Sequence, residues 1–206
     1  YDCLFFQSNP CHLIFQNPRL SDEELEEFYS SGTYRQTLNV SDEGKDNDEM
    51  SRAKFDTEII RRCVGRPNSH LDVGCSRGYL LDLVGAKVKV GVDEDTDGVR
   101  VKGIDVYSDM GQIPHKKFDL VTAIHVLEHV AHPLEYLTEM ARFVKESGAV
   151  VIEVPTWKSP AGPLRLAHLS HFEPDVLKLM CLRVGLSVEQ VLFTPHLILI
   201  CKGGPG

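Results

Sequence analysis

The chain has 206 residues, of which 42% are hydrophobic and 25% charged, and it carries a formal net charge of −8 at pH 7. This length accommodates one α/β domain with a modest extension and argues against two large independent domains. The acidic balance argues against a nucleic-acid partner, which needs clustered lysine and arginine, and no stretch approaches the roughly 20 apolar residues that span a bilayer.

The N-terminal part of the chain is acidic and differs in pattern from the rest. We expect a lead-in segment at 1–50 and one domain at 51–206. Ser21 and Glu24 form a capping box, which predicts that a short helical extension begins there and ends near residue 32. The polar run at 39–49 predicts a loop or a poorly ordered linker.

Helical periodicity resumes around residue 51 and stops at 65–67, and from residue 70 strand-like and helix-like segments alternate. We expect further helices at 79–84, 96–101, 133–145 and 174–184, and strands at 70–73, 87–92, 104–107, 118–123, 149–154, 187–193 and 197–201. The last two strands are predicted to pair antiparallel. Repeated βαβ units predict a Rossmann-like α/β fold, with a seven-stranded, mostly parallel sheet covered on both faces.

Six cysteines are scattered along the chain without a Cys-x-x-Cys pair, at positions 3, 11, 63, 75, 181 and 201. This pattern is typical of a reduced, cytoplasmic protein rather than of a disulfide framework or a complete zinc ribbon. The chain opens on Tyr1 without a signal-peptide pattern, so we expect an excised domain or a trimmed form of a longer protein.

A glycine-containing turn follows the first predicted strand of the sheet, where doubly wound folds bind their ligands. Gly74 removes a β-carbon where the backbone leaves the strand, and Gly78 allows close approach of the next helix. The G-x-x-x-G spacing differs from the G-x-G-x-x-G of dinucleotide sites, and no Gly-Lys-Ser/Thr follows as in a P-loop. Phosphate-bearing cofactors are therefore disfavoured.

The segment His70–Leu80, which contains Asp72, Gly74 and Gly78, resembles the first motif of class I S-adenosylmethionine-dependent methyltransferases. Ser76 stands where the middle glycine of that motif is common. Val90-Gly91-Val92-Asp93 resembles the second motif. The resemblance continues in order and spacing over roughly residues 68 to 202, which is more specific than any single motif.

The resemblance implies S-adenosyl-L-methionine as the cofactor. It places Asp93 at the two ribose hydroxyls, where a carboxylate accepts two hydrogen bonds side by side, and Asp109 at the adenine amino group. Asp72 is placed either at the cofactor's amino group or in hydrogen bonds to the loop. The full set of implied cofactor contacts is Asp72, Gly74, Cys75, Ser76, Gly78, Asp93, Glu94, Asp109, Met110, Ile124 and His125.

Three histidines are candidate bases for removing the acceptor's proton: His129, His168 and His171. Imidazole suits this task because its unperturbed pKa lies close to neutrality. Each has a structural alternative. The Glu128-His129 pair also serves to tie loops together, and the other two precede a helix that they are equally suited to cap.

A metal-assisted reaction is the alternative to a metal-free site. His125-x-x-Glu128-His129 with a later histidine resembles the metal-binding set of small-RNA 3′-terminal 2′-O-methyltransferases and some quinone O-methyltransferases, which have a glutamate at the position of His125. Histidine and carboxylate ligands suit a divalent ion that lowers the pKa of a bound hydroxyl. Our leading interpretation assigns no metal.

Residues 13–35 resemble the lead-in of bacterial methyltransferases that modify sugars and other small molecules, often with a zinc ribbon upstream. Here only Cys3 and Cys11 precede it, while Tyr29 and Tyr34 are candidates for closing over the cofactor. The resemblance implies a small-molecule acceptor methylated on oxygen or carbon. A third interpretation is a catalytically degenerate cofactor-binding domain that serves protein interaction. The oligomeric state stays open.

Overall fold

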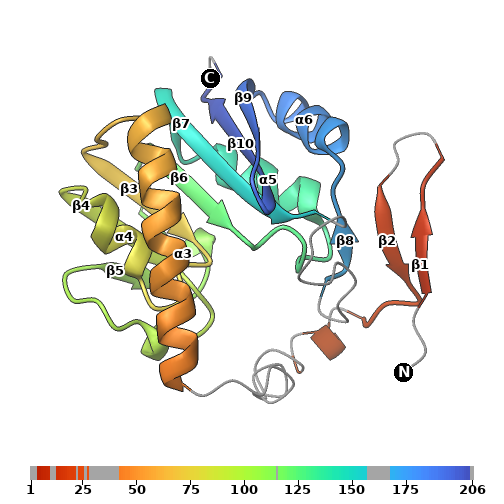
Figure 1. The fold of residues 1–206 in the computed structure, drawn as a ribbon, viewed down its shortest axis with the longest axis horizontal. Coiled ribbons are helices and arrows are strands. Elements are labelled where there is room, and N and C mark those ends of the chain that lie inside the picture. The colour runs from red at the N-terminus through yellow and green to blue at the C-terminus, as the bar shows by residue number, and fades with distance from the viewer. Residues whose placement is uncertain are drawn as a thin grey trace.

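The computed structural model describes residues 4–9, 13–21, 23–25, 27, 42–114, 116–156 and 168–204. Its main element is a seven-stranded sheet in the order β5-β4-β3-β6-β7-β10-β9 (Figure 1). The strands of this sheet are β3 (Ser69–Val73), β4 (Val88–Val92), β5 (Asp105–Tyr107), β6 (Phe118–Ile124), β7 (Val144–Pro155), β9 (Ser187–Phe193) and β10 (His196–Lys202).

The first five strands of the sheet in chain order are parallel, and β10 pairs antiparallel with both β7 and β9. This arrangement confirms the predicted Rossmann-like sheet with its antiparallel end. β3 lies between β4 and β6, so the strand order reverses direction at β3. Ligands of such sheets bind at this switch point, beyond the carboxyl ends of the strands.

Helices cover both faces of the sheet, and alternate side chains of each strand point to opposite layers. Leu120, Val151 and Ile198 pack toward α3 (Asp42–Cys63) and α4 (Tyr79–Val84). Their strand neighbours, such as Val121, pack toward the layer of α5 (Pro133–Ala141) and α6 (Pro174–Arg183). The helix predicted at 96–101 is wrong beyond its first turn, because only a 3₁₀ turn forms at Thr96–Gly98 and Val99 is already extended. A second 3₁₀ turn occurs at Met110–Gln112. Among the described ranges, no helix combines the length and apolar character needed to cross a membrane.

The expectation of a loop at 39–49 is wrong from residue 42 onward. α3 begins at Asp42 and continues without interruption to Cys63, so the predicted domain boundary at residue 50 falls inside this helix. Asp, Asn, Ser and Gly have low helix propensity, and their frequency in this stretch made it look like a linker. In the folded chain, the first turns of α3 are stabilised by contacts with the loop after β3. These contacts cannot be predicted from the local sequence.

The helix predicted at 133–145 is also too long, because α5 ends at Ala141 and β7 begins at Val144. The amide of Phe118 donates a 2.7 Å hydrogen bond to the carbonyl of Phe143. Val144 is buried and pairs with Phe118 across β6 and β7. Sheet pairing therefore takes over from helical hydrogen bonding one turn earlier than the periodicity indicated.

A second, three-stranded sheet was not predicted. It contains β1 (Leu4–Gln7), β2 (Ile14–Asn17) and β8 (Ser170–His171), and it pairs the N-terminal hairpin with a segment more than 150 residues away in sequence. Figure 1 shows β1 and β2 (red) beside β8 (blue). The predicted capping box is confirmed, since Ser21 N donates to Glu24 Oε2 and Glu24 N donates to Ser21 Oγ.

Candidate functional site

The loop after β3 has the left-handed backbone that its glycines allow. Gly74 has φ +77° and Gly78 has φ +81°, while Ser76, at the position of the missing glycine, has φ +45°. A β-carbon at Gly74 would clash with the side chain of Val126, and one at Gly78 would meet Ile104 Cδ1 at 2.8 Å. The two glycines are therefore required by both conformation and space.

Asp93 follows β4 and fixes this loop through backbone amides. Its Oδ2 accepts a 2.8 Å hydrogen bond from Ser76 N, and its Oδ1 accepts a 3.0 Å bond from Asp95 N. The side chain is half-buried at the carboxyl edge of the sheet. Asp93 thus stands where the second-motif resemblance places an acceptor for ribose hydroxyls, one strand away from the glycines.

Asp72 lies deep in the sheet rather than against the loop amides. Thr122 Oγ1 donates to its Oδ1 at 2.6 Å, and the same hydroxyl lies 2.7 Å from His70 Nε2. Burial raises the pKa of Asp72 to about 7, with a further contribution from the charge of Asp93. Burial also lowers the pKa of His70 to about 3, so that this ring is neutral. Asp72 is therefore a carboxyl whose ionisation near neutral pH responds to a nearby cation.

The remaining predicted cofactor contacts surround the same edge. Asp109 caps the 3₁₀ turn that follows β5, accepting a 2.7 Å hydrogen bond from Gly111 N. Glu94 is exposed, Met110 is buried and Ile124 is half-buried at the end of β6. Cys75 is buried, and burial raises the pKa of its thiol, so this cysteine is no nucleophile.

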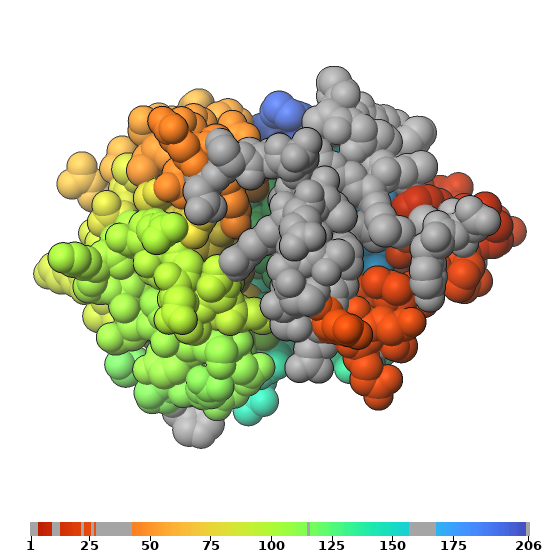
Figure 2. Space-filling view, turned by 90° about the horizontal axis from the view of Figure 1, so that it is seen from below, coloured from red at the N-terminus to blue at the C-terminus, as the bar shows by residue number. Residues whose placement is uncertain are grey.

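Helix α3 contributes side chains to this site that the sequence interpretation missed. Ser76 Oγ donates a 3.0 Å hydrogen bond to Glu49 Oε1. Arg77 Nε lies 3.0 Å from Asp46 Oδ1, and Arg77 Nη1 donates to Gly98 O at 3.1 Å. Figure 2 shows the N-terminal end of α3 (orange) beside the yellow and green segments that follow β3 to β5. No known motif covers these acids, so only the fold reveals their role.

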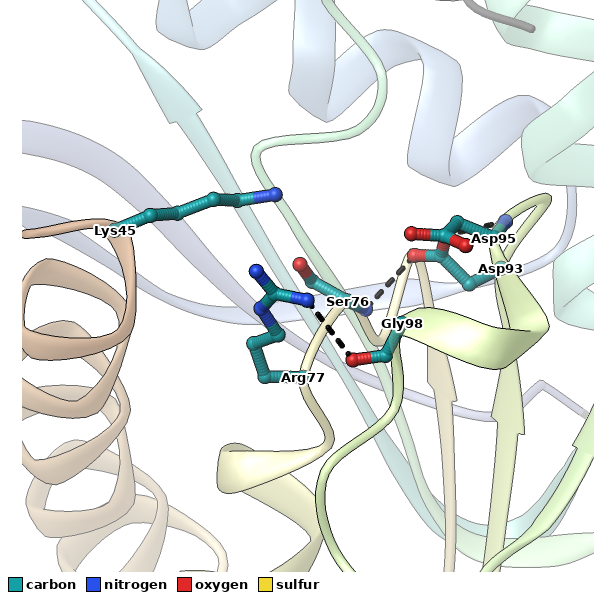
Figure 3. Close-up of a pocket in the computed structure, with 6 residues that line it drawn as sticks. All are labelled: Lys45, Ser76, Arg77, Asp93, Asp95 and Gly98. Atoms are coloured by element: carbon teal, nitrogen blue, oxygen red, sulfur yellow. Dashed lines mark hydrogen bonds between the residues drawn. The ribbon is translucent and has the colours of Figure 1, made fainter. Parts of the chain in front are cut away.

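These contacts enclose a small polar cavity of about 40 Å³ (Figure 3). It is lined by Lys45, Ser76, Arg77, Asp93, Asp95 and Gly98. Its lining combines two carboxylates, Asp93 and Asp95, with two cations, Lys45 and Arg77.

The three candidate bases converge at the next part of the sheet edge. The rings of His129 and His168 have centroids 4.9 Å apart, and those of His168 and His171 are 5.6 Å apart. The backbone carbonyl of Glu128 accepts hydrogen bonds from the amides of Leu169 and Ser170, which ties the segment after β6 to β8. The sequence alone could not predict this, because β8 is positioned by its pairing with the N-terminal hairpin.

His171 is the most deeply enclosed of the three. Its side chain is 1% exposed, and neither ring nitrogen has a hydrogen-bond partner among the described residues. The ring of Phe5 packs edge-on against it at 5.6 Å. Burial lowers the pKa of His171, which favours the neutral form of the ring.

His125 is predicted as a cofactor contact, and its side chain forms a bridge between two buried carboxylates. Nδ1 lies 3.1 Å from Glu128 Oε1, and Nε2 lies 3.1 Å from Glu153 Oε1. Burial by itself lowers the pKa of His125, but the hydrogen bonds and charges of the two carboxylates outweigh it and raise this pKa to about 9. The residue is therefore an imidazolium at neutral pH, and its backbone has φ +56°.

The bridge continues to Asp56 on α3. Burial raises the pKa of Asp56 to about 8, and the charge of Glu153 and a hydrogen bond with it act in the same direction. Asp56 is therefore a carboxyl that keeps its proton near neutral pH. His196 packs edge-on against His125, with ring centroids 4.4 Å apart. A continuous row of ionisable groups thus links α3 to the histidine cluster.

The residues present fit S-adenosylmethionine. Acceptor groups end three neighbouring strands, with Asp72 on β3, Asp93 after β4 and Asp109 after β5. These match a ligand whose amino group, ribose hydroxyls and adenine amino group are all donors. The same carboxylates would repel a phosphate-bearing cofactor, which agrees with the absence of the dinucleotide spacing.

Comparisons with known proteins agree with this geometry. A family model described as a methyltransferase domain matches residues 48–191. A probable S-adenosylmethionine-dependent methyltransferase of Mycolicibacterium smegmatis is 26% identical over 152 residues, which is 67% of this chain and 58% of that protein. A ubiquinone biosynthesis O-methyltransferase of Thiobacillus denitrificans is 31% identical over 96 residues, covering 39% of this chain and 41% of that protein. The chain therefore spans about half the length of the curated relatives it matches.

Among solved structures, the fold is similar to that of 1,6-didemethyltoxoflavin-N1-methyltransferase from Burkholderia thailandensis, which holds its substrate and S-adenosylhomocysteine. The TM-score is 0.67 at 16% identity, and the alignment covers 100% of both chains. At this identity the likeness shows the fold alone. Because the family model covers most of the chain and the strand ends carry the acceptor groups that its cofactor needs, this chain belongs to the methyltransferase domain family and is an S-adenosylmethionine-dependent methyltransferase domain.

Proposed function

We propose that this domain methylates an oxygen or carbon nucleophile of a small molecule, such as a sugar or a natural-product intermediate. We also propose His129, His168 and His171 as the group that receives the acceptor's proton. The observation that carries the proposal is the convergence of these three rings at the carboxyl edge of the sheet, beside the strand that bears the glycine loop.

Bound S-adenosylmethionine supplies an electrophilic methyl group, so the protein's task is to orient the acceptor and remove its proton. The ring nitrogens of His171 have no partner among the described residues, and the unprotonated nitrogen of the neutral ring can accept a hydrogen bond from a hydroxyl or take up its proton. Glu128 Oε1 lies 3.8 Å from His129 Nε2, which places a carboxylate beside that ring. The cluster therefore offers both a hydrogen-bond acceptor and a proton acceptor.

A small acceptor is supported by the net charge of −8 and by the relatives. The similar Burkholderia thailandensis structure holds 1,6-didemethyltoxoflavin, and the Thiobacillus denitrificans relative is named for ubiquinone biosynthesis. We propose that the cofactor contacts implied by the sequence bind the methyl donor. They are Asp72, Gly74, Cys75, Ser76, Gly78, Asp93, Glu94, Asp109, Met110, Ile124 and His125. Four described cysteines are free, which supports a reducing, cytoplasmic location.

The test is methyl transfer from labelled S-adenosylmethionine to a panel of sugars, quinols and phenols. We expect turnover of at least one small hydroxyl or carbon acceptor. His171→Asn and His129→Asn should each lower kcat on that acceptor while affinity for S-adenosylhomocysteine stays within about twofold. Cofactor binding without turnover on a broad panel would instead support a degenerate interaction domain.

A second candidate is a metal-assisted O-methyltransferase, and one observation favours it. Glu128, His129 and His168 each offer a ligand atom, and these atoms lie within 4.8 Å of one another. Such a set suits a divalent ion with open positions for a hydroxyl pair. His125, at the position of a glutamate in the metal enzymes, instead bridges Glu128 to Glu153. Turnover that is abolished by a chelator and restored by a divalent ion would establish this candidate over the metal-free one.

A further inference from the structure

A second cluster of metal-ligating side chains lies at the carboxyl edge of the sheet, apart from the three candidate bases. His125, Glu153 and His196 each offer one ligand atom, and these atoms lie within 4.8 Å of one another. Alternation along the strands places Glu153 with Val151 and His196 with Ile198, on the face of the sheet that α3 covers. The end of β6 and the paired strands β7 and β10 thus bring two imidazoles and a carboxylate to one point.

The ring of His125 has the surroundings of a metal-ligating histidine. Its Nε2 faces Glu153 Oε1 at 3.1 Å, and its Nδ1 faces Glu128 Oε1 at 3.1 Å. Histidines that bind a metal through one ring nitrogen almost always donate the other N–H to a carboxylate or a carbonyl. Glu128 therefore fixes the ring so that Nε2 is the ligating nitrogen. In the chain without an ion, a proton on Nε2 holds the ring to Glu153, and metal binding displaces this proton.

Glu153 is a buried carboxylate in a position that calls for a cation. Its side chain is 1% exposed, and its Oε2 receives no hydrogen bond from an N–H group or an alcohol of the described residues. Burying a carboxylate is costly unless a positive charge or a hydrogen-bond donor compensates it. The carboxyl group of Asp56, itself buried, forms a hydrogen bond with Glu153. Ligating carboxylates in metal sites are held by such outer hydrogen bonds.

We propose that His125, Glu153 and His196 bind a divalent transition-metal ion of the Zn²⁺ class, with Glu128 and Asp56 as the outer partners that orient the ligands. Zn²⁺ takes two histidines and one glutamate in proteins, with water in the fourth position. Imidazole ligands disfavour Mg²⁺ and Ca²⁺, which prefer oxygen. The half-buried ring of His196 leaves an entry path from solvent. The ion ties β7 and β10 to the end of β6, and the proposal depends on neither the cofactor nor the acceptor.

The test is isothermal titration calorimetry of Zn²⁺ into the full chain, which is first freed of metal with a chelator. His196→Asn removes a half-buried ligand, and Glu153→Gln removes the carboxylate charge while keeping the shape of the side chain. His168→Asn is the matched control, because it removes a histidine from the other group of candidate ligands, which contains Glu128 and His129. Circular dichroism confirms that each variant is folded, and His196→Asn carries the test alone if Glu153→Gln does not fold.

We expect wild type to bind Zn²⁺, and His196→Asn and Glu153→Gln to weaken binding by about a hundredfold, since outer partners alone are worth about 10–100-fold. His168→Asn should keep the wild-type affinity. Two ions per chain, of which His196→Asn removes one and His168→Asn the other, would also support the site. A wild-type chain that binds no Zn²⁺, an affinity unchanged in His196→Asn, or a loss confined to His168→Asn would overturn the proposal.

Discussion

His125 Nδ1 lies 3.1 Å from Oε1 of Glu128, and this contact orients a buried carboxylate beside the histidine cluster. Glu128 is 1% exposed, and although burial alone raises its pKa, the hydrogen bond from His125 and the nearby histidine charges outweigh that effect and lower it. Glu128 therefore keeps its negative charge, and its Oε1 lies 3.8 Å from His129 Nε2.

His125→Asn tests this bridge through the pH dependence of stability. Asparagine tolerates the left-handed backbone, so the variant removes the charge with little strain. The pKa of His125 is raised to about 9 in the folded chain, so its stabilisation is fully present below pH 6.5 and is lost as pH rises through 9. Urea unfolding should show a loss of about 3 kcal/mol at pH 6 and a much smaller loss at pH 9.5. An equal loss of stability at both pH values would contradict the role of His125 as a charged bridge. The same pH-dependent loss in His132→Asn would contradict it as well.

The raised pKa of Asp72 predicts that cofactor affinity depends on pH. An ionised Asp72 can pair with the cofactor's ammonium, whereas a protonated one cannot, so affinity for S-adenosylhomocysteine should rise as pH increases toward about 7 and then level off. Asp72→Asn should remove this dependence. Thr122→Val removes the hydrogen bond that lowers this pKa, so its midpoint should move to higher pH. Titration calorimetry between about pH 5.5 and pH 8 measures how this affinity depends on pH. A wild-type affinity that stays constant over this range contradicts the assignment.

Gly74→Ala should be strongly destabilising, and the chain offers a matched control. Gly74 and Gly103 both have φ +77°, but a β-carbon at Gly103 meets nothing within 4 Å, whereas one at Gly74 clashes with Val126. Backbone strain alone is worth about 1 kcal/mol at either position, and the clash adds about 1–3 kcal/mol at Gly74. Chemical denaturation of the two variants measures the difference directly. Equal losses would show that the loop does not pack on Val126, and Val126→Ala should partly rescue Gly74→Ala.

The sequence predicted the strands of the main sheet well because alternate positions carry apolar residues for both helical layers, as in β6 and β10. It could not predict the start of α3 at Asp42, since the acids there are stabilised by Ser76 and Arg77 rather than by local propensity. The end of α5 was also misjudged, because the competing hydrogen bond to Phe143 comes from another strand.

The candidate site was predictable only where motifs mark it. Asp93 and the glycines follow strand ends, so their place at the sheet edge follows from the fold class. The contact between His168 and His171 depends on β8. This strand pairs with the N-terminal hairpin, whose strands are too short for the sequence pattern to predict. The contacts of Glu49 with Ser76 and of Glu153 with His125 join elements that are distant in the sequence, so only the fold reveals them. Tyr29 and Tyr34, the candidates for closing over the cofactor, lie outside the described residues, as do Cys3 and Cys11.

The most direct test of the central claim is urea unfolding of the wild-type chain with and without S-adenosylhomocysteine. A ligand that binds only the folded state, at about 100 times its Kd, adds about 2.7 kcal/mol to the free energy of unfolding. Asp93→Asn should lose most of this increment, because Asp93 both accepts from Ser76 and is the proposed ribose acceptor. A gain in wild type that is reduced in Asp93→Asn is the predicted result. An unfolding curve that millimolar S-adenosylhomocysteine leaves unchanged would contradict the account.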